Sequence, residues 1–183
     1  MNEMDRERDK YRRMWARPEY RVSSPGETAV AKFASLVPRE GTILDVGCGT
    51  GRAALVLEAL GWDVAMNDLV WEAVDEEAKH IRFYEGPIHE LTNMQFDWIY
   101  CVDMLEHVPP TLVETTLDAI CDIACVGAFL QISCSPDGCG ALIGETLHLT
   151  IRPPEWWYTQ VTERWRVRAD LSYDNYAIFL CER

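Results

Sequence analysis

Residues 43–51 decide the fold of this chain; they read Ile-Leu-Asp-Val-Gly-Cys-Gly-Thr-Gly. The run 42–46 is short, largely apolar and begins with two β-branched residues, which predicts a buried strand. Three glycines follow at positions 47, 49 and 51, and a helix-like stretch begins at Arg52. A strand, a tight glycine turn and a helix N-terminus together present open backbone and unpaired N–H groups to a nucleotide-like ligand.

Two details of this stretch narrow the ligand. A dinucleotide fingerprint of the form G-x-G-x-x-G requires a glycine at position 52, where this chain has Arg52. Asp45 lies two residues before the first glycine, where it would repel a pyrophosphate but favour an ammonium group. These features disfavour an NAD-dependent oxidoreductase and fit S-adenosylmethionine, which has a cationic sulfonium and an α-amino group.

The string from Leu44 to Gly51 closely resembles the first motif of class I S-adenosylmethionine-dependent methyltransferases, and the resemblance covers roughly residues 24–183. A second stretch, Leu105-Glu106-His107 followed by an apolar residue, resembles the segment after strand four in many small-molecule members. The resemblance implies an α/β, Rossmann-like fold: a seven-stranded, mostly parallel sheet with one antiparallel strand and helices on both faces. It also implies cofactor contacts by Asp45, Gly47, Cys48, Gly49 and Gly51.

The remaining patterns agree with this fold. Ser24, Pro25 and Glu27 form a capping box, which predicts a helix from residue 25 to about 36. Strands are expected at 42–46, 62–67, 81–84, 96–102, 126–132, 165–172 and 176–181, and further helices at 52–60, 69–79, 110–124 and from 153 onward. Residues 133–153 are rich in glycine and proline and predict a long functional loop.

Other cofactor contacts are expected along the same sheet edge. Asp68 lies about 20 positions after the first glycine, where an acidic side chain binds ribose hydroxyls, although it could instead cap the helix 69–79. Leu69 comes just after the second strand and Val102 is the last residue of the fourth, and both are expected to contact the cofactor. Because Pro87 occupies the position at which relatives usually have an acidic residue near the adenine, Ile88 is the better adenine contact.

The chain divides into residues 1–23, an N-terminal helical lid or extension, and the methyltransferase domain at 24–183. The first segment is highly charged, with Trp15 and Tyr20 among its few large apolar groups. We expect these two to lie near the cofactor and Arg13 or Arg21 to bind its carboxylate. The alternative is a terminus that is merely packed or frayed.

His107 and His148 are the candidate catalytic bases for a hydroxyl acceptor, because a neutral imidazole can accept a proton near neutral pH. His107 follows strand four, and His148 lies in the long loop. A structural role remains the alternative for each. No metal is expected, since the spacing of Cys134, Cys139 and His148 matches no familiar zinc pattern.

Composition limits the function further. The 183 residues suffice for one domain, and the formal net charge of −13 disfavours nucleic acid as a partner. No apolar run reaches the ~20 residues of a membrane span, and seven cysteines suit reduced thiols in a cytoplasmic monomer or homodimer. The expected activity is O- or N-methylation of a small molecule, such as a sugar or nucleotide-linked metabolite. A catalytically silent S-adenosylmethionine-binding module that acts through a protein partner is the alternative.

Overall fold

The computed structural model describes residues 3–91 and 93–183, and its centre is a seven-stranded sheet. The strand order is β3-β2-β1-β4-β5-β7-β6, and β7 runs antiparallel to both of its neighbours while the other paired strands run parallel. This confirms the predicted sheet. The bounds are Thr42–Val46 (β1), Asp63–Asp68 (β2), Arg82–Glu85 (β3), Phe96–Val102 (β4), Ala124–Ser133 (β5), Arg166–Asp170 (β6) and Tyr176–Glu182 (β7).

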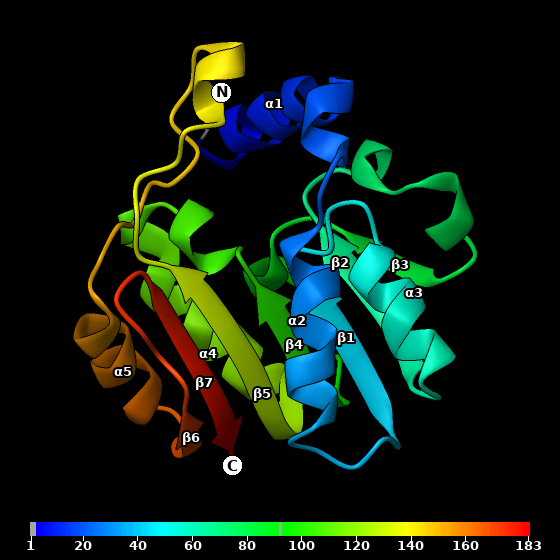
Figure 1. The fold of residues 1–183 in the computed structure, drawn as a ribbon, viewed down its shortest axis with the longest axis vertical. Coiled ribbons are helices and arrows are strands. Elements are labelled where there is room, and N and C mark those ends of the chain that lie inside the picture. Colours follow the sequence, from blue (N-terminus) through cyan, green and yellow to red (C-terminus); the bar gives the residue numbers. More distant parts are fainter. Residues whose placement is uncertain (1–2, 92) are drawn as a thin grey trace.

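Helices cover both faces of the sheet (Figure 1). Alternation along β1 places Ile43 in one apolar core with α2 and α3, and Leu44 in the other core with α4 and α5. Each face is therefore buried, as a parallel sheet requires. The helices span Glu3–Trp15 (α1), Pro25–Ala34 (α2), Arg52–Ala59 (α3), Val113–Ile123 (α4) and Pro154–Thr162 (α5).

The start of α2 follows the predicted capping signal. The Ser24 hydroxyl accepts a hydrogen bond from the backbone N–H of Glu27 at 3.2 Å, and Pro25 takes the first helical position. The cap matters for the site, because it fixes the point where the chain leaves the N-terminal segment and joins the domain.

The prediction of a helix at 69–79 is wrong. The structure has two short 3-10 turns there, Trp71–Ala73 and Glu76–Ala78. The carbonyl oxygen of Ala73 accepts a hydrogen bond from the Arg21 side chain at 2.9 Å, and the backbone N–H of Asp75 donates to Thr50 at 3.0 Å. Long-range partners thus take backbone groups that a continuous helix would use internally.

The segment between β5 and α5 is irregular, as predicted, apart from one 3-10 turn at Gly140–Ile143. Together with α1 it lies above the carboxyl ends of the parallel strands, at the top of Figure 1. Within the described ranges, no helix is long and apolar enough to cross a membrane.

Candidate functional site

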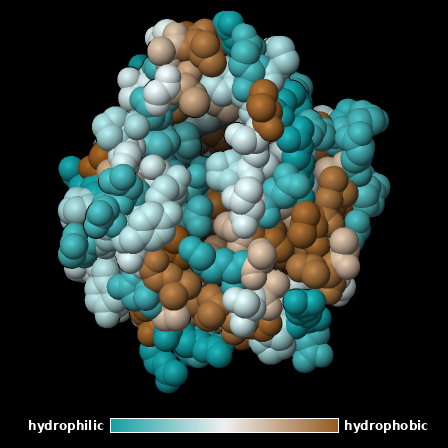
Figure 2. Space-filling view, viewed as in Figure 1, coloured by the Kyte–Doolittle hydropathy of each residue, from teal (hydrophilic) through white to brown (hydrophobic). Residues whose placement is uncertain are grey.

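A cavity of about 500 Å³ lies over the carboxyl ends of the parallel strands. Its wall runs from the β3 end, at Gly86, through the glycine turn after β1 to Asp103 after β4 and Tyr176 at the start of β7. Figure 2 shows the molecule hollowed on this face, below its uppermost segment. Ligands of open α/β sheets bind at this edge, where the strand order reverses between β1 and β4.

The glycine turn forms the floor of the cavity and needs its glycines for steric reasons. Gly47 has φ +72°, and a Cβ there would lie 2.3 Å from Cγ of Met104. Gly49 has φ +51°, and a Cβ there would lie 3.0 Å from the Trp15 ring. Gly51 does not line the cavity; a Cβ on it would meet Ala78 at 2.7 Å, so this glycine serves the packing of α3.

Two buried carboxylates flank the turn. Asp45 is 3% exposed, and its Oδ2 has no hydrogen-bond partner within the described residues. Burial, with the charge of Asp68 adding to it, raises the pKa of Asp45 to about 8. Asp68 accepts a hydrogen bond from the Gly49 N–H at 2.8 Å and a longer one from the Val70 N–H at 3.4 Å, and burial raises its pKa. Within the described residues, no lysine or arginine pairs with either carboxylate. A ligand that has an ammonium group and hydroxyl donors would therefore fit them.

The other predicted cofactor contacts lie on the same wall. Leu69, Ile88 and Val102 line the cavity, as does Cys48. The side chain of Asn67 donates to the carbonyl oxygens of Tyr84 and Gly86 at 2.9 and 2.8 Å, which fixes the turn after β3. Sequence reasoning missed Asn67, because its role depends on pairing between β2 and β3.

The N-terminal segment closes the cavity from above. Trp15 and Tyr20 line it, as predicted. The Tyr20 hydroxyl donates to the carbonyl oxygen of Cys139 at 2.6 Å, and the buried Lys10 donates to that of Thr146 at 3.3 Å. The segment is thus tied directly to the loop after β5.

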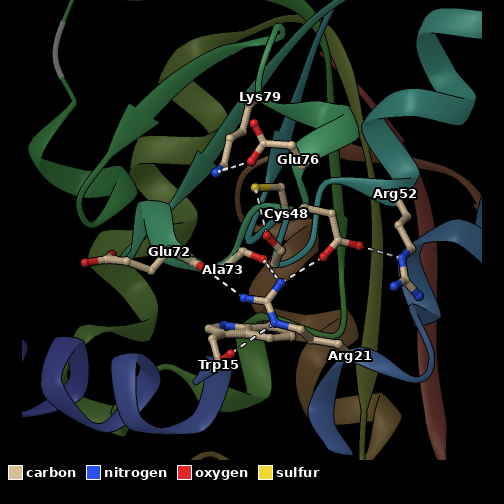
Figure 3. A network of polar contacts seen from close by, with 10 residues as sticks. Trp15, Arg21, Cys48, Arg52, Glu72, Ala73, Glu76 and Lys79 are labelled. Carbon is tan, nitrogen blue, oxygen red and sulfur yellow. Dashed lines mark hydrogen bonds and ion pairs between the residues drawn. The ribbon is translucent and has the colours of Figure 1, made fainter. Parts of the chain in front are cut away.

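Arg21 anchors this segment to the β2 side of the site (Figure 3). Its guanidinium donates to the carbonyl oxygens of Trp15, Ala73 and Glu72 and to the carboxylate of Asp75, at 2.6–3.1 Å. Neither Arg21 nor Arg13 lines the cavity, since Arg13 pairs with the Glu145 carboxylate. The arginines expected to bind the cofactor carboxylate therefore hold the N-terminal segment in place instead.

His107 and His148 meet at the opposite end of the cavity, with ring centroids 4.7 Å apart. Nδ1 of His107 lies 3.1 Å from the carbonyl oxygen of Leu147, and Nδ1 of His148 lies 2.6 Å from that of Ser135. Because a carbonyl oxygen only accepts, both Nδ1 atoms donate, which leaves Nε2 as the possible acceptor atom of each ring. Burial lowers the pKa of His107 to about 3, so this ring is neutral at physiological pH.

Glu106 is a third member of this cluster that sequence reasoning did not select. Its side chain is fully buried; Oε1 accepts from the Ser133 N–H at 3.1 Å, and Oε2 has no partner within the described residues. Burial raises its pKa. Donor atoms of Glu106, His107 and His148 lie within 4.8 Å of one another, close enough to hold a metal ion. Within the described chain, Cys134 and Cys139 join no such group.

Asp103 completes this end of the cavity and was also missed. It has φ +49°, an uncommon value for a residue with a side chain, and its N–H donates to the carbonyl oxygen of Gln131 at 2.8 Å. The Gln131 amide donates to its carboxylate at 3.3 Å, and burial raises the pKa of Asp103. The sequence pattern that could have identified Asp103 is an acidic residue directly after an apolar strand.

Comparison with known proteins agrees with this site. A family model described as a methyltransferase domain matches residues 14–168. Ubiquinone biosynthesis O-methyltransferase of Xanthomonas axonopodis pv. citri is 34% identical over 91 residues, which cover 44% of this chain and 38% of that protein. The enzyme of the same name from Rickettsia canadensis is 34% identical over 74 residues, or 36% and 31%. The matches thus span about a third of the length of these relatives.

Solved structures show the same fold. The 1,6-didemethyltoxoflavin-N1-methyltransferase of Burkholderia thailandensis, with bound S-adenosylhomocysteine, aligns with a TM-score of 0.75 at 19% identity over 96% of this chain and 86% of that one. Magnesium protoporphyrin IX methyltransferase from Synechocystis gives 0.69 at 18% identity, over 86% and 81%. The chain therefore belongs to the methyltransferase-domain family and has the class I methyltransferase fold.

Proposed function

We propose that this enzyme methylates an oxygen or nitrogen atom of a small molecule bound between the glycine turn and the His107–His148 pair. The observation that supports this is the continuity of the cavity from the glycine turn to two imidazoles whose Nδ1 atoms both donate to backbone carbonyl oxygens. S-adenosylmethionine, when bound, supplies a methyl group already activated by its sulfonium.

The residues around the turn hold the cofactor in this proposal. Asp68 has lone pairs left for the ribose hydroxyls after it accepts from the Gly49 N–H, and the unpartnered Oδ2 of Asp45 suits an ammonium. Glycines at 47 and 49 let the turn pack directly against Met104 and Trp15, so the backbone itself forms the floor of the cofactor site. The remaining contacts come from apolar and aromatic side chains of the wall: Trp15, Tyr20, Cys48, Leu69, Ile88 and Val102.

When the acceptor is a hydroxyl, Nε2 of His107 or of His148 is the candidate proton acceptor, and the pKa of about 3 makes His107 a weak base. Its carbonyl partner at Leu147 fixes the tautomer, and β4 fixes its backbone position. His148 is the second candidate, on the loop. Its short hydrogen bond to Ser135 orients it in the same way. For an amine acceptor, which is already nucleophilic, the two rings orient the substrate and exclude water.

We further propose that residues 1–23 form a lid and residues 24–183 the catalytic domain. The contacts of Tyr20 and Lys10 with the loop after β5 support a lid. All seven cysteines are free thiols, which supports a reducing compartment such as the cytoplasm. We propose a monomer or homodimer.

The test combines binding and turnover. Calorimetry with S-adenosylmethionine should give saturable binding, and release of S-adenosylhomocysteine should depend on an acceptor from a panel of phenols, sugars and amines. Binding without turnover on any acceptor would favour the catalytically silent module. Absence of cofactor binding would overturn the proposal.

A further inference from the structure

We propose that the methyl acceptor is an uncharged or cationic, largely apolar molecule, and that the acceptor end of the cavity excludes phosphate- and carboxylate-bearing molecules. The inference rests on the proposed function and narrows it. It removes nucleotide-linked metabolites from the acceptors suggested by the sequence. The observation behind it is the charge of the cavity wall.

Five carboxylates line the cavity, and no lysine or arginine of the described residues does. Asp45 and Asp68 belong to the cofactor end, next to the glycine turn. The others lie on α1, after β4 and after β5; they are Glu7, Asp103 and Asp137. Such a wall offers an anion no positive charge, and an unpaired anion is costly where water is excluded.

Basic side chains near the acceptor end are already paired. The Lys10 ammonium lies 2.5 Å from the Glu7 carboxylate, and Arg13 pairs with Glu145. Arg8, whose buried Nε has no hydrogen-bond partner among the described residues, lies near Gly86 at the β3 end, where its Nη2 is 4.0 Å from a Cβ built on that glycine. This cation is therefore placed at the cofactor end of the cavity and not at the acceptor end.

Backbone N–H groups are occupied as well. Asp137 accepts hydrogen bonds from the N–H groups of Gly140 and Leu147 at 2.6 and 2.9 Å. These two amides are therefore not available to an anionic ligand. The loop after β5 thus places a carboxylate on the cavity wall and keeps these N–H donors for it.

Burial disfavours negative charge at this end of the cavity. Burial raises the pKa of Asp103, and in Glu106 the charge of Asp103 adds to this effect. Because negative charge on these two carboxyl groups is already unfavourable, binding of an additional anion here would be still less favourable. The rest of this end is apolar, with Met104, Val108, Pro109, Leu112 and Pro136 on the wall, which suits a ring or an alkyl portion.

A charge series of small probes tests the inference on the protein saturated with S-adenosylhomocysteine. Phenol, benzylamine, benzoate and phenyl phosphate share a ring and differ in charge. Calorimetry and ligand-observed NMR should show phenol or benzylamine binding at least about tenfold more tightly than either anion. Equal affinities, tighter binding of an anion, or no binding of both phenol and benzylamine at their solubility limit would overturn the inference.

Asp103→Asn provides the matched perturbation, because asparagine has the same size and also tolerates a positive φ. The preference for phenol over phenyl phosphate should fall several-fold in this variant. Glu163→Gln, an equal charge change on an exposed side chain outside the cavity, should leave the preference unchanged. An unchanged ratio in Asp103→Asn would remove Asp103 from the discrimination.

The two levels of proposal fail separately. If S-adenosylhomocysteine did not bind, the proposed function itself would fall. If it bound normally and phenyl phosphate bound as well as phenol, only the charge preference would be wrong.

Discussion

Replacing Asp68 by asparagine separates cofactor recognition from folding. The Asp68 carboxylate accepts from the Gly49 N–H at 2.8 Å and weakly from the Val70 N–H at 3.4 Å. Each oxygen has about two acceptor sites, so one remains on each oxygen for the ribose hydroxyls. An asparagine oxygen can keep the Gly49 bond, whereas the amide nitrogen cannot accept a hydroxyl proton.

The expected loss follows from this count. One charge-assisted hydrogen bond is lost and another is weakened, which costs about 1.5–3 kcal/mol of binding, or about 10- to 150-fold in Kd. The ligand-free protein should keep its melting temperature or gain slightly, since the variant removes a buried charge whose pKa is already raised.

Titration calorimetry with S-adenosylhomocysteine and a thermal melt measure the two effects on the same sample. Asp63→Asn, the same charge change at the exposed start of β2, is the control and should bind like the parent. A Kd for Asp68→Asn within twofold of the parent would refute the ribose assignment. A loss of affinity matched by a collapse in melting temperature would show that Asp68 acts only by holding the turn.

Four further outcomes are expected. Asp45 keeps a proton up to about pH 8 in the native state but loses it near pH 4 in the unfolded state, so the free energy of unfolding falls as pH rises between these values, by up to about 1.4 kcal/mol per pH unit from this group. Urea unfolding at pH 5 to 8 should show that the free energy of unfolding depends less on pH in Asp45→Asn than in the parent. Identical pH dependence in the two proteins would contradict the assignment. His107→Ala should lower turnover of a hydroxyl acceptor about 10²–10⁴-fold with little change in cofactor affinity; if only His148→Ala does so in steady-state assays, the base lies on the loop. Turnover should survive dialysis against EDTA, because a histidine base needs no metal; loss of turnover that a divalent cation restores would reassign Glu106 and both histidines as metal ligands. Deleting residues 1–21 should weaken cofactor binding in calorimetry far more than it lowers the melting temperature of the ligand-free protein, and an unchanged Kd would argue against a lid.

Local patterns predicted the cofactor half of the site. The strand, the glycine turn and the helix at 42–59 are adjacent in sequence, and Gly47 and Gly49 are required by contacts that any side chain would violate. Asp68 could be placed because the distance from the first glycine is set by one βαβ unit. These features can be predicted from neighbouring residues, without knowing how the rest of the chain folds.

The acceptor half depends on contacts between distant segments and could not be predicted in the same way. The roles of Glu106 and Asp137 arise only when the loop after β5 folds back, so that Leu149 and Leu147 donate to the Glu106 carbonyl and the Asp137 carboxylate. For the same reason Arg21 was assigned to the cofactor, although its partners on the β2 side, Glu72, Ala73 and Asp75, lie more than 50 residues away.

A crystal structure of the protein with S-adenosylhomocysteine is the measurement that tests the central claim most directly. We expect the ligand in the 500 Å³ cavity, with its ribose hydroxyls on the Asp68 carboxylate, its ammonium towards Asp45 and its sulfur facing the His107–His148 pair. Electron density for the ligand outside this cavity, or a ribose that makes no contact with Asp68, would contradict the account.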